Sequence, residues 1–316
     1  MKYKVFVDGS EGTTGLKIHE YLCKREDIEI LSIESKYRKD IEARQALLNE
    51  ADIVFLCLPD AAAKESISLI NNKETRIIDA STAHRTNIDW TYGLPELNNK
   101  QRDKIKNSKR VTVPGCHATG FIALLYPLVG QGIVPKDYPI IAYSISGYSG
   151  GGKKLIKWCE DNHFSNMNSP KPYRLDLNHK HLPEMQKITG LSFEPAFTPM
   201  ISNYYKGMSV SIPLFSRLLS NKYTVFDIHK ILLEYYQDEK FINVIPQDIE
   251  NSLEDGYLNV EANNDTNRLD IFVSGNENKI LITSRLDNLG KGASGAAIQN
   301  MNLMLGLKED TGLKVY

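Results

Sequence analysis

One cysteine of this sequence stands in a setting typical of a reactive thiol. Cys116 follows a Pro-Gly pair in the run VTVPGCHATG, where a strand-like stretch ends and an apolar helix is predicted to begin. A helix N-terminus stabilises a thiolate, because its exposed N–H groups and its dipole favour negative charge. The sequence therefore predicts Cys116 as a nucleophile, whereas Cys23, Cys57 and Cys159 stand in stretches typical of buried apolar cysteines.

A thiolate nucleophile usually works with an acid or base, and the run HKHLPE offers two histidines and a glutamate. His181 and Glu184 are spaced to share one face of a helical turn, so that the carboxylate would orient the imidazole. An ordinary core or surface role and metal ligation are the other interpretations. Metal ligation is disfavoured, because no cysteine or further histidine stands at zinc-site spacing.

Two further runs end strands with polar and basic residues. DASTAHR carries Ser81 and Arg85, and an arginine there would bind a phosphate or carboxylate bidentately. SISGYSGGGKK carries Ser149, Gly150 and Lys153, which would present N–H groups and positive charge to an anionic substrate. Both runs are equally typical of structural loops.

The run DGSEGTTG places three glycines at i, i+3 and i+6 between a predicted strand and a helix. Backbone N–H groups in such a turn hold a pyrophosphate, although the spacing differs from the commonest dinucleotide fingerprint and also suits a purely structural turn. The predicted cofactor residues in this run are Gly9, Ser10, Gly12, Thr13, Thr14 and Gly15.

A basic cluster follows the second predicted strand, where the adenosine ribose of a bound dinucleotide would lie. Ser35, Lys36 and Arg38 offer partners for a 2'-phosphate, which favours NADP over NAD. Glu34 leaves the alternative open, because a carboxylate there would bind an unphosphorylated ribose. A solvated helix start is the structural interpretation.

The elements that must position these residues change character along the chain. Before Cys116, apolar strands alternate with helical patterns, which predicts a parallel sheet covered by helices, the arrangement of an α/β Rossmann-like domain. After it, strands with fewer helices predict an α+β domain with a mixed sheet. The predicted strands are 4–8, 28–34, 51–58 and 76–80, then 138–146, 208–213, 258–262, 270–274 and 279–285, and a last helix is predicted over 288–307.

Bulk composition limits the function classes. The chain has 316 residues, 41% of them hydrophobic and 24% charged, with a formal net charge of -1. This profile is typical of a cytoplasmic globular protein of two domains, with no nucleic-acid or membrane partner. The cysteines show no C-x-x-C pairing and would stay as thiols in a reducing compartment.

Taken in order, seven motifs resemble the short form of the N-acetyl-γ-glutamyl-phosphate reductase family, within the semialdehyde dehydrogenase group. They are DGSEGTTG, DASTAHR, YGLPEL, VPGCHATG, SGYSGGGK, HKHLPE and KGASGAAIQNMNL. The resemblance implies that Cys116 forms a thioester with the acyl phosphate, that NADPH reduces it, and that His181 is the acid/base group with Glu184 in support. It also implies that Arg85 and the loop from Ser149 to Lys153 hold the substrate.

The resemblance extends to domains and partners. It implies an NADP(H)-binding domain over 1–115 that 288–316 completes, a catalytic and oligomerisation domain over 116–287, and a homo-oligomer, dimer or tetramer. A segment with Asn288, Lys291 and Gly292 would close over the nicotinamide. The nearest alternative is an aspartate-semialdehyde dehydrogenase or a carrier-protein-linked relative that acts on another acyl phosphate. A non-catalytic NADP-sensing module is the alternative of another class.

Overall fold

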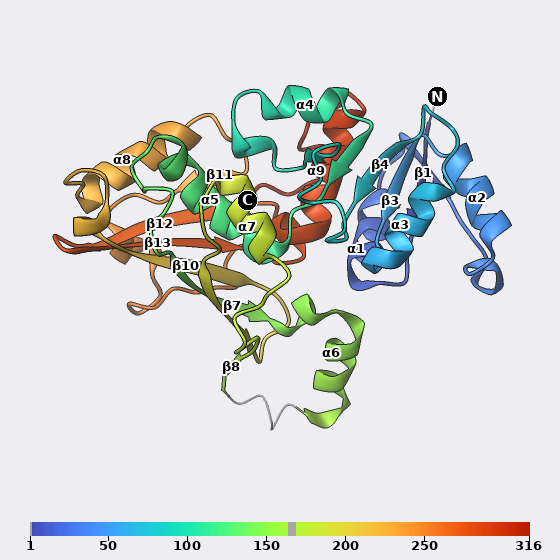
Figure 1. Cartoon of the computed structure of the whole chain (residues 1–316). Coiled ribbons are helices and arrows are strands. Elements are labelled where there is room, and N and C mark those ends of the chain that lie inside the picture. The colour runs from blue at the N-terminus through green and yellow to red at the C-terminus, as the bar shows by residue number, and fades with distance from the viewer. Residues whose placement is uncertain (1, 164–168) are drawn as a thin grey trace. The chain divides into compact units, whose positions relative to one another are not determined.

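The structure is a computed structural model that describes residues 2–163 and 169–316, and the chain divides into two compact units. The first comprises the chain up to Gly115 together with Ala293–Leu313. The second runs from Cys116 to Gly292 and includes the last three residues. Each unit is built around a sheet of its own (Figure 1).

Within the described residues, the sheet of the first unit has six strands in the order β2-β1-β3-β4-β6-β5, and every neighbouring pair is parallel. This confirms the predicted doubly covered α/β arrangement. The elements are β1 (Tyr3–Asp8), α1 (Thr13–Leu22), β2 (Ile28–Leu31), α2 (Ile41–Glu50), β3 (Ile53–Leu56), α3 (Asp60–Ser68), β4 (Arg76–Asp79), β5 (Thr91–Tyr92), α4 (Gln101–Asn107), β6 (Arg110–Thr112) and α9 (Gly295–Met304).

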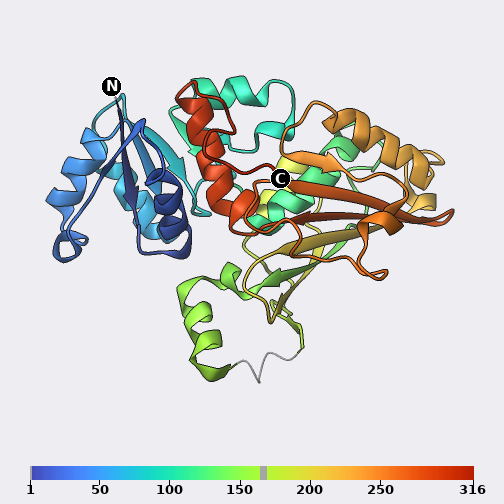
Figure 2. The ribbon, with the colours of Figure 1, turned by 180° about the vertical axis from the view of Figure 1, so that it is seen from behind.

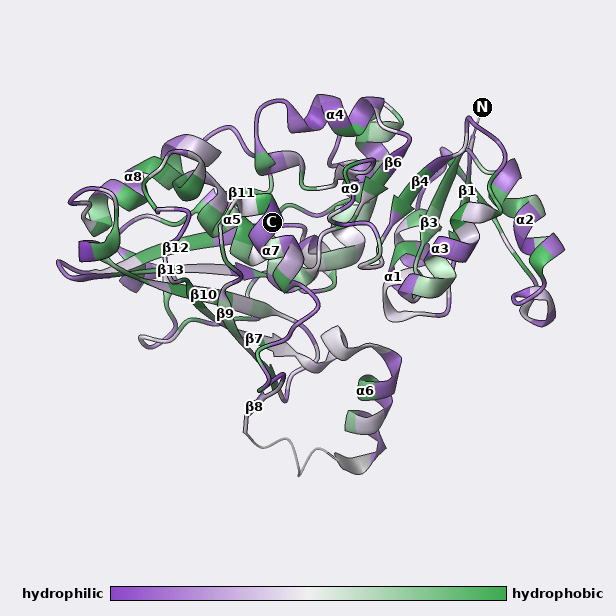
Figure 3. Cartoon of the chain, in the orientation of Figure 1, coloured by the Kyte–Doolittle hydropathy of each residue, from purple (hydrophilic) through white to green (hydrophobic). Residues whose placement is uncertain are grey.

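Strands buried on both faces explain the continuous apolar runs of this unit. Successive side chains of β1 point to opposite faces, so Val5 and Val7 join the core cluster that contains α9 residues, whereas Phe6 joins a second cluster on the other face. Figure 3 shows the resulting contrast between hydrophobic strands β1, β3 and β4 and the hydrophilic surface of α4.

The C-terminal segment differs from the predicted helix over 288–307. A π-helical turn, Gly290–Ser294, precedes α9, and the helix ends at Met304. Ala297 and Met301 of α9 belong to the core of the first unit, and α9 packs against α1 and α4 (Figure 2). Residues 288–292 instead belong to the second unit, and glycines on both sides of Lys291 explain why regular α-helix begins only after them.

The described residues of the second unit form a seven-stranded mixed sheet in the order β11-β12-β13-β10-β7-β9-β8, as predicted in kind. Its elements are α5 (Cys116–Gly130), β7 (Ile141–Gly147), α6 (Gly152–Trp158), β8 (Lys171–Pro172), α7 (Leu182–Thr189), β9 (Ala196–Ser202), β10 (Met208–Phe215), α8 (Val225–Tyr236), β11 (Ile242–Val244), β12 (Leu269–Asn276) and β13 (Lys279–Leu286).

Helices α5 and α8 pack on one face of this sheet. A Cβ on Gly120 of α5 would lie 2.5 Å from Ser284 Oγ of β13 and 2.8 Å from Val210 Cγ2 of β10. This glycine therefore lets α5 lie close to the sheet. Tyr143 of β7 pairs with Ser211 of β10, and the side chains of both lie on the face of the sheet opposite α5.

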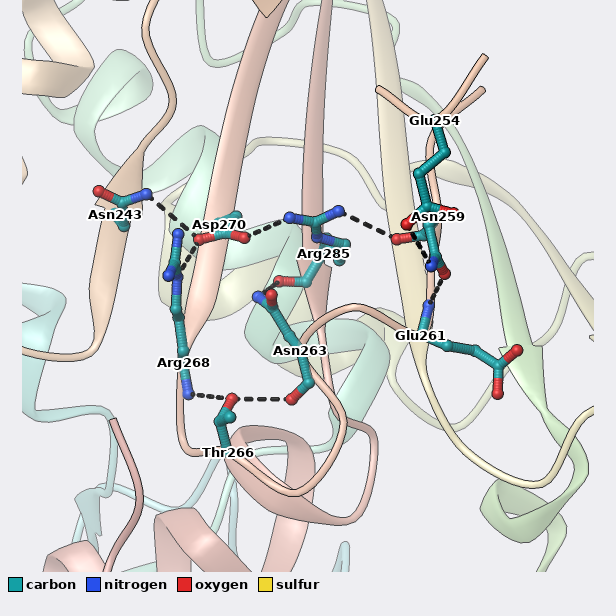
Figure 4. A network of polar contacts seen from close by, with 9 residues as sticks. All are labelled: Asn243, Glu254, Asn259, Glu261, Asn263, Thr266, Arg268, Asp270 and Arg285. Carbon is teal, nitrogen blue, oxygen red and sulfur yellow. Dashed lines mark hydrogen bonds and ion pairs between the residues drawn. The ribbon is translucent and has the colours of Figure 1, made fainter. Parts of the chain in front are cut away.

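The predicted strand over 258–262 is wrong, because this segment is a loop held by asparagine side chains (Figure 4). Asn259 accepts a hydrogen bond from the backbone of Glu261, and Asn263 donates to the carbonyl of Arg285. Arg285 in turn donates to the carbonyl of Asn259 and to the buried carboxylate of Asp270. Side chains thus take the backbone groups that a strand would have paired.

Candidate active site

Cys116 is the first residue of α5, a 15-residue helix whose side chains are mostly buried. Cys116 is partly exposed. A Cβ on Gly292 would lie 2.8 Å from Cys116 Cβ, so the backbone at Gly292 lies directly against Cys116. The helix N-terminus is the setting that the sequence predicts for this thiol.

Three imidazoles cluster next to this position. The ring centroids of His117 and His181 are 5.7 Å apart, those of His117 and His179 are 5.4 Å apart, and those of His179 and His181 are 4.7 Å apart. All three residues are buried. His179 Nδ1 accepts a hydrogen bond of 3.1 Å from the backbone N–H of His181, which fixes the proton of a neutral His179 on Nε2.

His117 is bonded at both ring nitrogens. Nδ1 lies 2.9 Å from Ser144 Oγ, and Nε2 lies 3.2 Å from the hydroxyl of Tyr173. Burial, together with the charges of His179 and Lys180, lowers the pKa of His117 from its ordinary 6.5 to about 3. His117 is therefore neutral near pH 7.

His181 and Glu184 lie at the start of α7, as their spacing predicts. His181 is the N-cap residue, a proline follows in the first turn, and Glu184 lies in the same turn with 2% of its surface exposed. Helix α7 packs against α5, whose first residue is Cys116. The predicted nucleophile, imidazole and carboxylate thus belong to the same pair of helices.

Part of the predicted anion-binding loop after β7 is held by hydrogen bonds within the protein. Ser149 is 1% exposed, and its hydroxyl accepts a 2.9 Å hydrogen bond from Asn288 Nδ2. Asn288 Oδ1 accepts from the backbone N–H of Gly207 at 2.8 Å. Gly150 and Lys153 are exposed. Asn288 therefore fastens this loop to the segment that leads to Gly292.

Lys291 lies inside the second unit. It is fully buried, and its ammonium lies 5.4 Å from the centroid of the Phe241 ring, a cation–π contact. The sequence does not predict the burial of Lys291, because lysine is almost never fully buried in folded proteins.

The glycine run of the first unit forms a tight strand-to-helix turn. Gly9 has φ +89°, and a Cβ there would lie 2.4 Å from the carbonyl oxygen of Cys57. A Cβ on Gly15 would lie 2.4 Å from the carbonyl oxygen of Gly9. Only glycine fits both positions, and the buried hydroxyl of Thr13 has no hydrogen-bond partner among the described residues. These features fit a bound pyrophosphate.

A pocket of about 640 Å³ opens beside this turn. Its lining includes five of the predicted cofactor residues: Gly9, Ser10, Ser35, Lys36 and Arg38. Arg38 bonds the hydroxyl of Ser35 and pairs with Glu11 at 3.2 Å, and Lys36 pairs with Glu34 at 3.0 Å. The pocket therefore combines the turn with exposed cations, which suits a dinucleotide that carries an additional phosphate.

Sequence reasoning missed a buried ion pair in the wall of this pocket. Arg44 is 7% exposed and donates to Asp8 Oδ2 at 3.0 Å and to Ser66 Oγ at 2.6 Å. Ser66 also donates to Asp8. Asp8 ends β1 beside the turn, so Arg44 neutralises a carboxylate next to the proposed phosphate position. The helical pattern around Arg44 resembles that of any surface helix.

Ser81 and Arg85 lie after β4, in the first unit. Both the backbone N–H and the hydroxyl of Ser81 donate to Asp79 at 2.8 Å. Arg85 is mostly buried and donates to the carbonyl of Ala80 at 3.1 Å. Ser81 therefore shapes the loop, and part of the Arg85 guanidinium is used within it.

Two properties of the described residues concern metal binding and membrane insertion. No group of three or more histidine, cysteine, aspartate or glutamate side chains in the described chain is arranged to hold a metal ion. Likewise, none of the helices between residues 2–163 and 169–316 has the length and apolar character needed to cross a membrane.

Comparison with known proteins agrees with both units. Residues 4–107 match the family model of the semialdehyde dehydrogenase NAD binding domain, and residues 116–288 match that of the semialdehyde dehydrogenase dimerisation domain. N-acetyl-gamma-glutamyl-phosphate reductase 2 of Nostoc sp. is 47% identical, and the match covers 99% of each chain. The protein of the same name in Pseudomonas putida is 44% identical over 98% of each chain.

Solved structures show the same fold. Aspartate semialdehyde dehydrogenase from Francisella tularensis superposes with a TM-score of 0.71 over 96% of this chain and 100% of that one, at 16% identity. The Candida albicans enzyme, crystallised with NADP, has a TM-score of 0.64 over 96% and 99% of the two chains, also at 16% identity. By the two domain matches and these relatives, the chain belongs to the semialdehyde dehydrogenase family and, within it, to the N-acetyl-gamma-glutamyl-phosphate reductases.

Proposed function

We propose that this chain reduces N-acetyl-γ-glutamyl phosphate to N-acetylglutamate semialdehyde and phosphate with NADPH, in arginine biosynthesis. The observation that carries the proposal is Cys116 at the start of α5, beside a cluster of three histidines, in a chain 43–47% identical to reductases of that name. The aspartate semialdehyde dehydrogenases that share its fold are only 13–16% identical. No observation favours the aspartyl substrate or a non-catalytic sensing module.

In the first half of the reaction, the Cys116 thiolate attacks the acyl carbon, phosphate leaves, and a thioester remains on the sulfur. The N–H groups at the start of α5 stabilise the thiolate before the attack. They also favour the negative charge that develops on the acyl oxygen during the attack. Bound NADPH supplies the hydride that reduces the thioester carbonyl.

His181 is the imidazole that we assign to proton transfer. His117 is neutral, with both ring nitrogens in hydrogen bonds, and His179 accepts the backbone proton of His181. His181 would remove the thiol proton of Cys116 and later donate a proton when the aldehyde is released. Glu184, in the same helical turn, would orient the ring and stabilise its charged form.

NADPH is proposed to bind the first unit at the glycine turn and its pocket. Gly9, Ser10, Gly12, Thr13, Thr14 and Gly15 would hold the pyrophosphate. Ser35, Lys36 and Arg38 would bind the 2'-phosphate, with Arg38 exchanging Glu11 for it. Gly292 would approach the nicotinamide end, with Asn288 and Lys291 holding its segment in place.

The substrate phosphate and carboxylate need cationic and N–H partners. We assign Arg85 and Lys153 as the cations and Gly150 as a backbone donor, while Ser81 and Ser149 set the shape of their loops through internal hydrogen bonds.

The division into an NADP(H)-binding part, 1–115 with 288–316, and a catalytic part, 116–287, is proposed together with a homodimer in the cytoplasm. The sheet face opposite α5 and α8 exposes Ile141 by 51% and Tyr143 by 40%, within the segment matched by the dimerisation model. Large apolar side chains on a sheet face fit a second copy of the chain, and dimers of dimers would give the tetramer.

The test is a reverse assay with NADP and phosphate. N-acetylglutamate semialdehyde should be oxidised at least about a hundredfold more efficiently than aspartate semialdehyde, because a site built for the acetylated substrate leaves buried polar groups unpaired with the other. Equal efficiency, or preference for the aspartyl compound, would overturn the substrate assignment.

A further inference from the structure

A chain of hydrogen bonds leads from the sheet of the second unit to His117, the residue that follows the proposed nucleophile in the sequence. Ser144 Oγ donates its one proton to the carbonyl of Ser209, 2.7 Å away. Only lone pairs of that oxygen then remain for His117 Nδ1, 2.9 Å away. His117 must therefore carry a proton on Nδ1 and donate it to Ser144.

The other nitrogen follows from the neutrality of the ring. A neutral imidazole has one N–H, so Nε2 of His117 is a hydrogen-bond acceptor. The hydroxyl of Tyr173, 3.2 Å from Nε2, therefore donates to it. Each hydrogen bond in this chain therefore has a defined donor: Tyr173 donates to His117, His117 donates to Ser144, and Ser144 donates to the carbonyl of Ser209.

The surroundings keep this arrangement neutral. The groups that face His117 are the rings of His179, His181 and Phe197, together with Tyr173 and Ser144. The charge of Lys180 also acts on it. Burial raises the pKa of Tyr173, and the charge of a Cys116 thiolate raises it further. The phenol therefore stays protonated.

We propose that His117 is a positioning residue: as a neutral imidazole protonated on Nδ1, it holds the hydroxyl of Tyr173 at the residue that follows Cys116. The Tyr173 proton is then directed to His117 and not to the thiolate, where a hydrogen bond would reduce nucleophilicity. His117 itself moves no proton during the reaction. The inference rests on the proposed role of Cys116 as the nucleophile.

The direction of the bonds has a spectroscopic signature. A long-range ¹H–¹⁵N spectrum of protein labelled at histidine nitrogen should show one ring, absent in His117→Asn, with a protonated Nδ1 and an unprotonated Nε2 from about pH 5 to about pH 9. A proton on Nε2, or titration of this ring near neutral pH, would overturn the proposal. The wild-type protein suffices for this measurement, with assignment from the remaining rings if the variant does not fold.

The effect on the nucleophile is measured by a double-mutant cycle. His117→Asn keeps an N–H near the Nδ1 position and removes the acceptor for Tyr173, whereas Tyr173→Phe removes the donor. His117→Asn frees the phenol proton for the thiolate and should slow reduction about tenfold. Tyr173→Phe has no such proton, so it should keep most of the rate and should restore it in the double variant. His117→Gln, whose amide oxygen reaches the Nε2 position, should recover part of the rate. Losses that multiply in the double variant would refute the coupling.

Alkylation of Cys116 by iodoacetamide in the same variants separates this inference from the proposed function. In the absence of any substrate, His117→Asn should slow alkylation, and Tyr173→Phe should restore the alkylation rate in the double variant. Turnover that survives Cys116→Ser would overturn the proposed function while leaving the proton directions intact. Normal chemistry at Cys116 together with a His117 protonated on Nε2 would overturn this inference and leave the proposed function intact.

Discussion

Gly292→Ala tests how closely the backbone before α9 fits against Cys116, the proposed nucleophile. The added Cβ would lie 2.8 Å from Cys116 Cβ and 3.1 Å from the carbonyl oxygen of Asp287. Carbon atoms prefer a separation of about 3.5–4.0 Å, so Gly292 and Cys116 must move apart by about 1 Å. The φ of Gly292 lies outside the left-handed region, so the methyl acts through contact alone.

A displacement of about 1 Å at a reacting group costs up to about a hundredfold in rate, while overpacking of this kind costs about 1–3 kcal/mol of stability. We therefore expect a folded variant whose Cys116 is acylated about 10–100 times more slowly. The assay is rapid-quench measurement of acyl-enzyme formation, with thermal unfolding recorded in parallel.

Gly290→Ala is the matched control. Its Cβ would meet the carbonyl oxygen of Thr266 at 2.2 Å but has no close contact with Cys116. This variant should lose stability and keep most of its acylation rate. Wild-type acylation in Gly292→Ala, or an equal loss in both variants, would show that the close approach to Cys116 does not matter for the chemistry.

Four further outcomes are expected. Cys116→Ser should abolish reduction and retain NADPH binding in fluorescence titrations, and a near-normal rate would refute its role as nucleophile. Arg38→Ala should weaken NADPH binding about tenfold more than NADH binding, whereas equal losses would argue against a 2'-phosphate contact. Because the folded pKa of His117 is about 3 against 6.5 ordinarily, the unfolded chain binds a proton that the folded chain rejects, and stability falls as pH drops from 6.5 toward 3. In urea unfolding, His117→Asn should show a smaller fall over that window, and parallel curves would contradict this. Tyr143→Arg should change the sedimentation coefficient from that of a dimer to that of a monomer. An unchanged coefficient would exclude this sheet face as the dimer interface.

The first unit is the part of the fold most accessible from sequence. Its strands are buried on both faces, so residues such as Val5, Phe6 and Val7 form continuous apolar runs, and turns with glycine separate them from helices. The glycine positions also carry their own geometric signature, because Gly9 and Gly15 leave no room for a Cβ. Local pattern and tertiary structure agree here.

The second unit is less accessible, because its contacts are made over long distances in the sequence. The apolar alternation over 258–262 suggests a strand, but the asparagines around it bond the backbone into a loop. Strand β9 and helix α8 were not predicted, although α8 begins with a capping box at Thr224.

The candidate site shows the same division. The sequence suffices to predict that Cys116 lies at a helix start and that His181 and Glu184 share a helical turn, whereas their catalytic roles stay predictions. Tyr173 has no local signal, since it reaches His117 across 56 residues. The direction of its hydrogen bond depends on Ser144 and Ser209, which only the sheet brings together.

Mass spectrometry of the protein mixed with N-acetyl-γ-glutamyl phosphate, without NADPH, tests the central claim most directly. We expect one acyl group, as a thioester, on the peptide that contains Cys116, and its loss when NADPH is added. An unmodified Cys116 in protein that turns over substrate, or an acyl group on another cysteine, would contradict it.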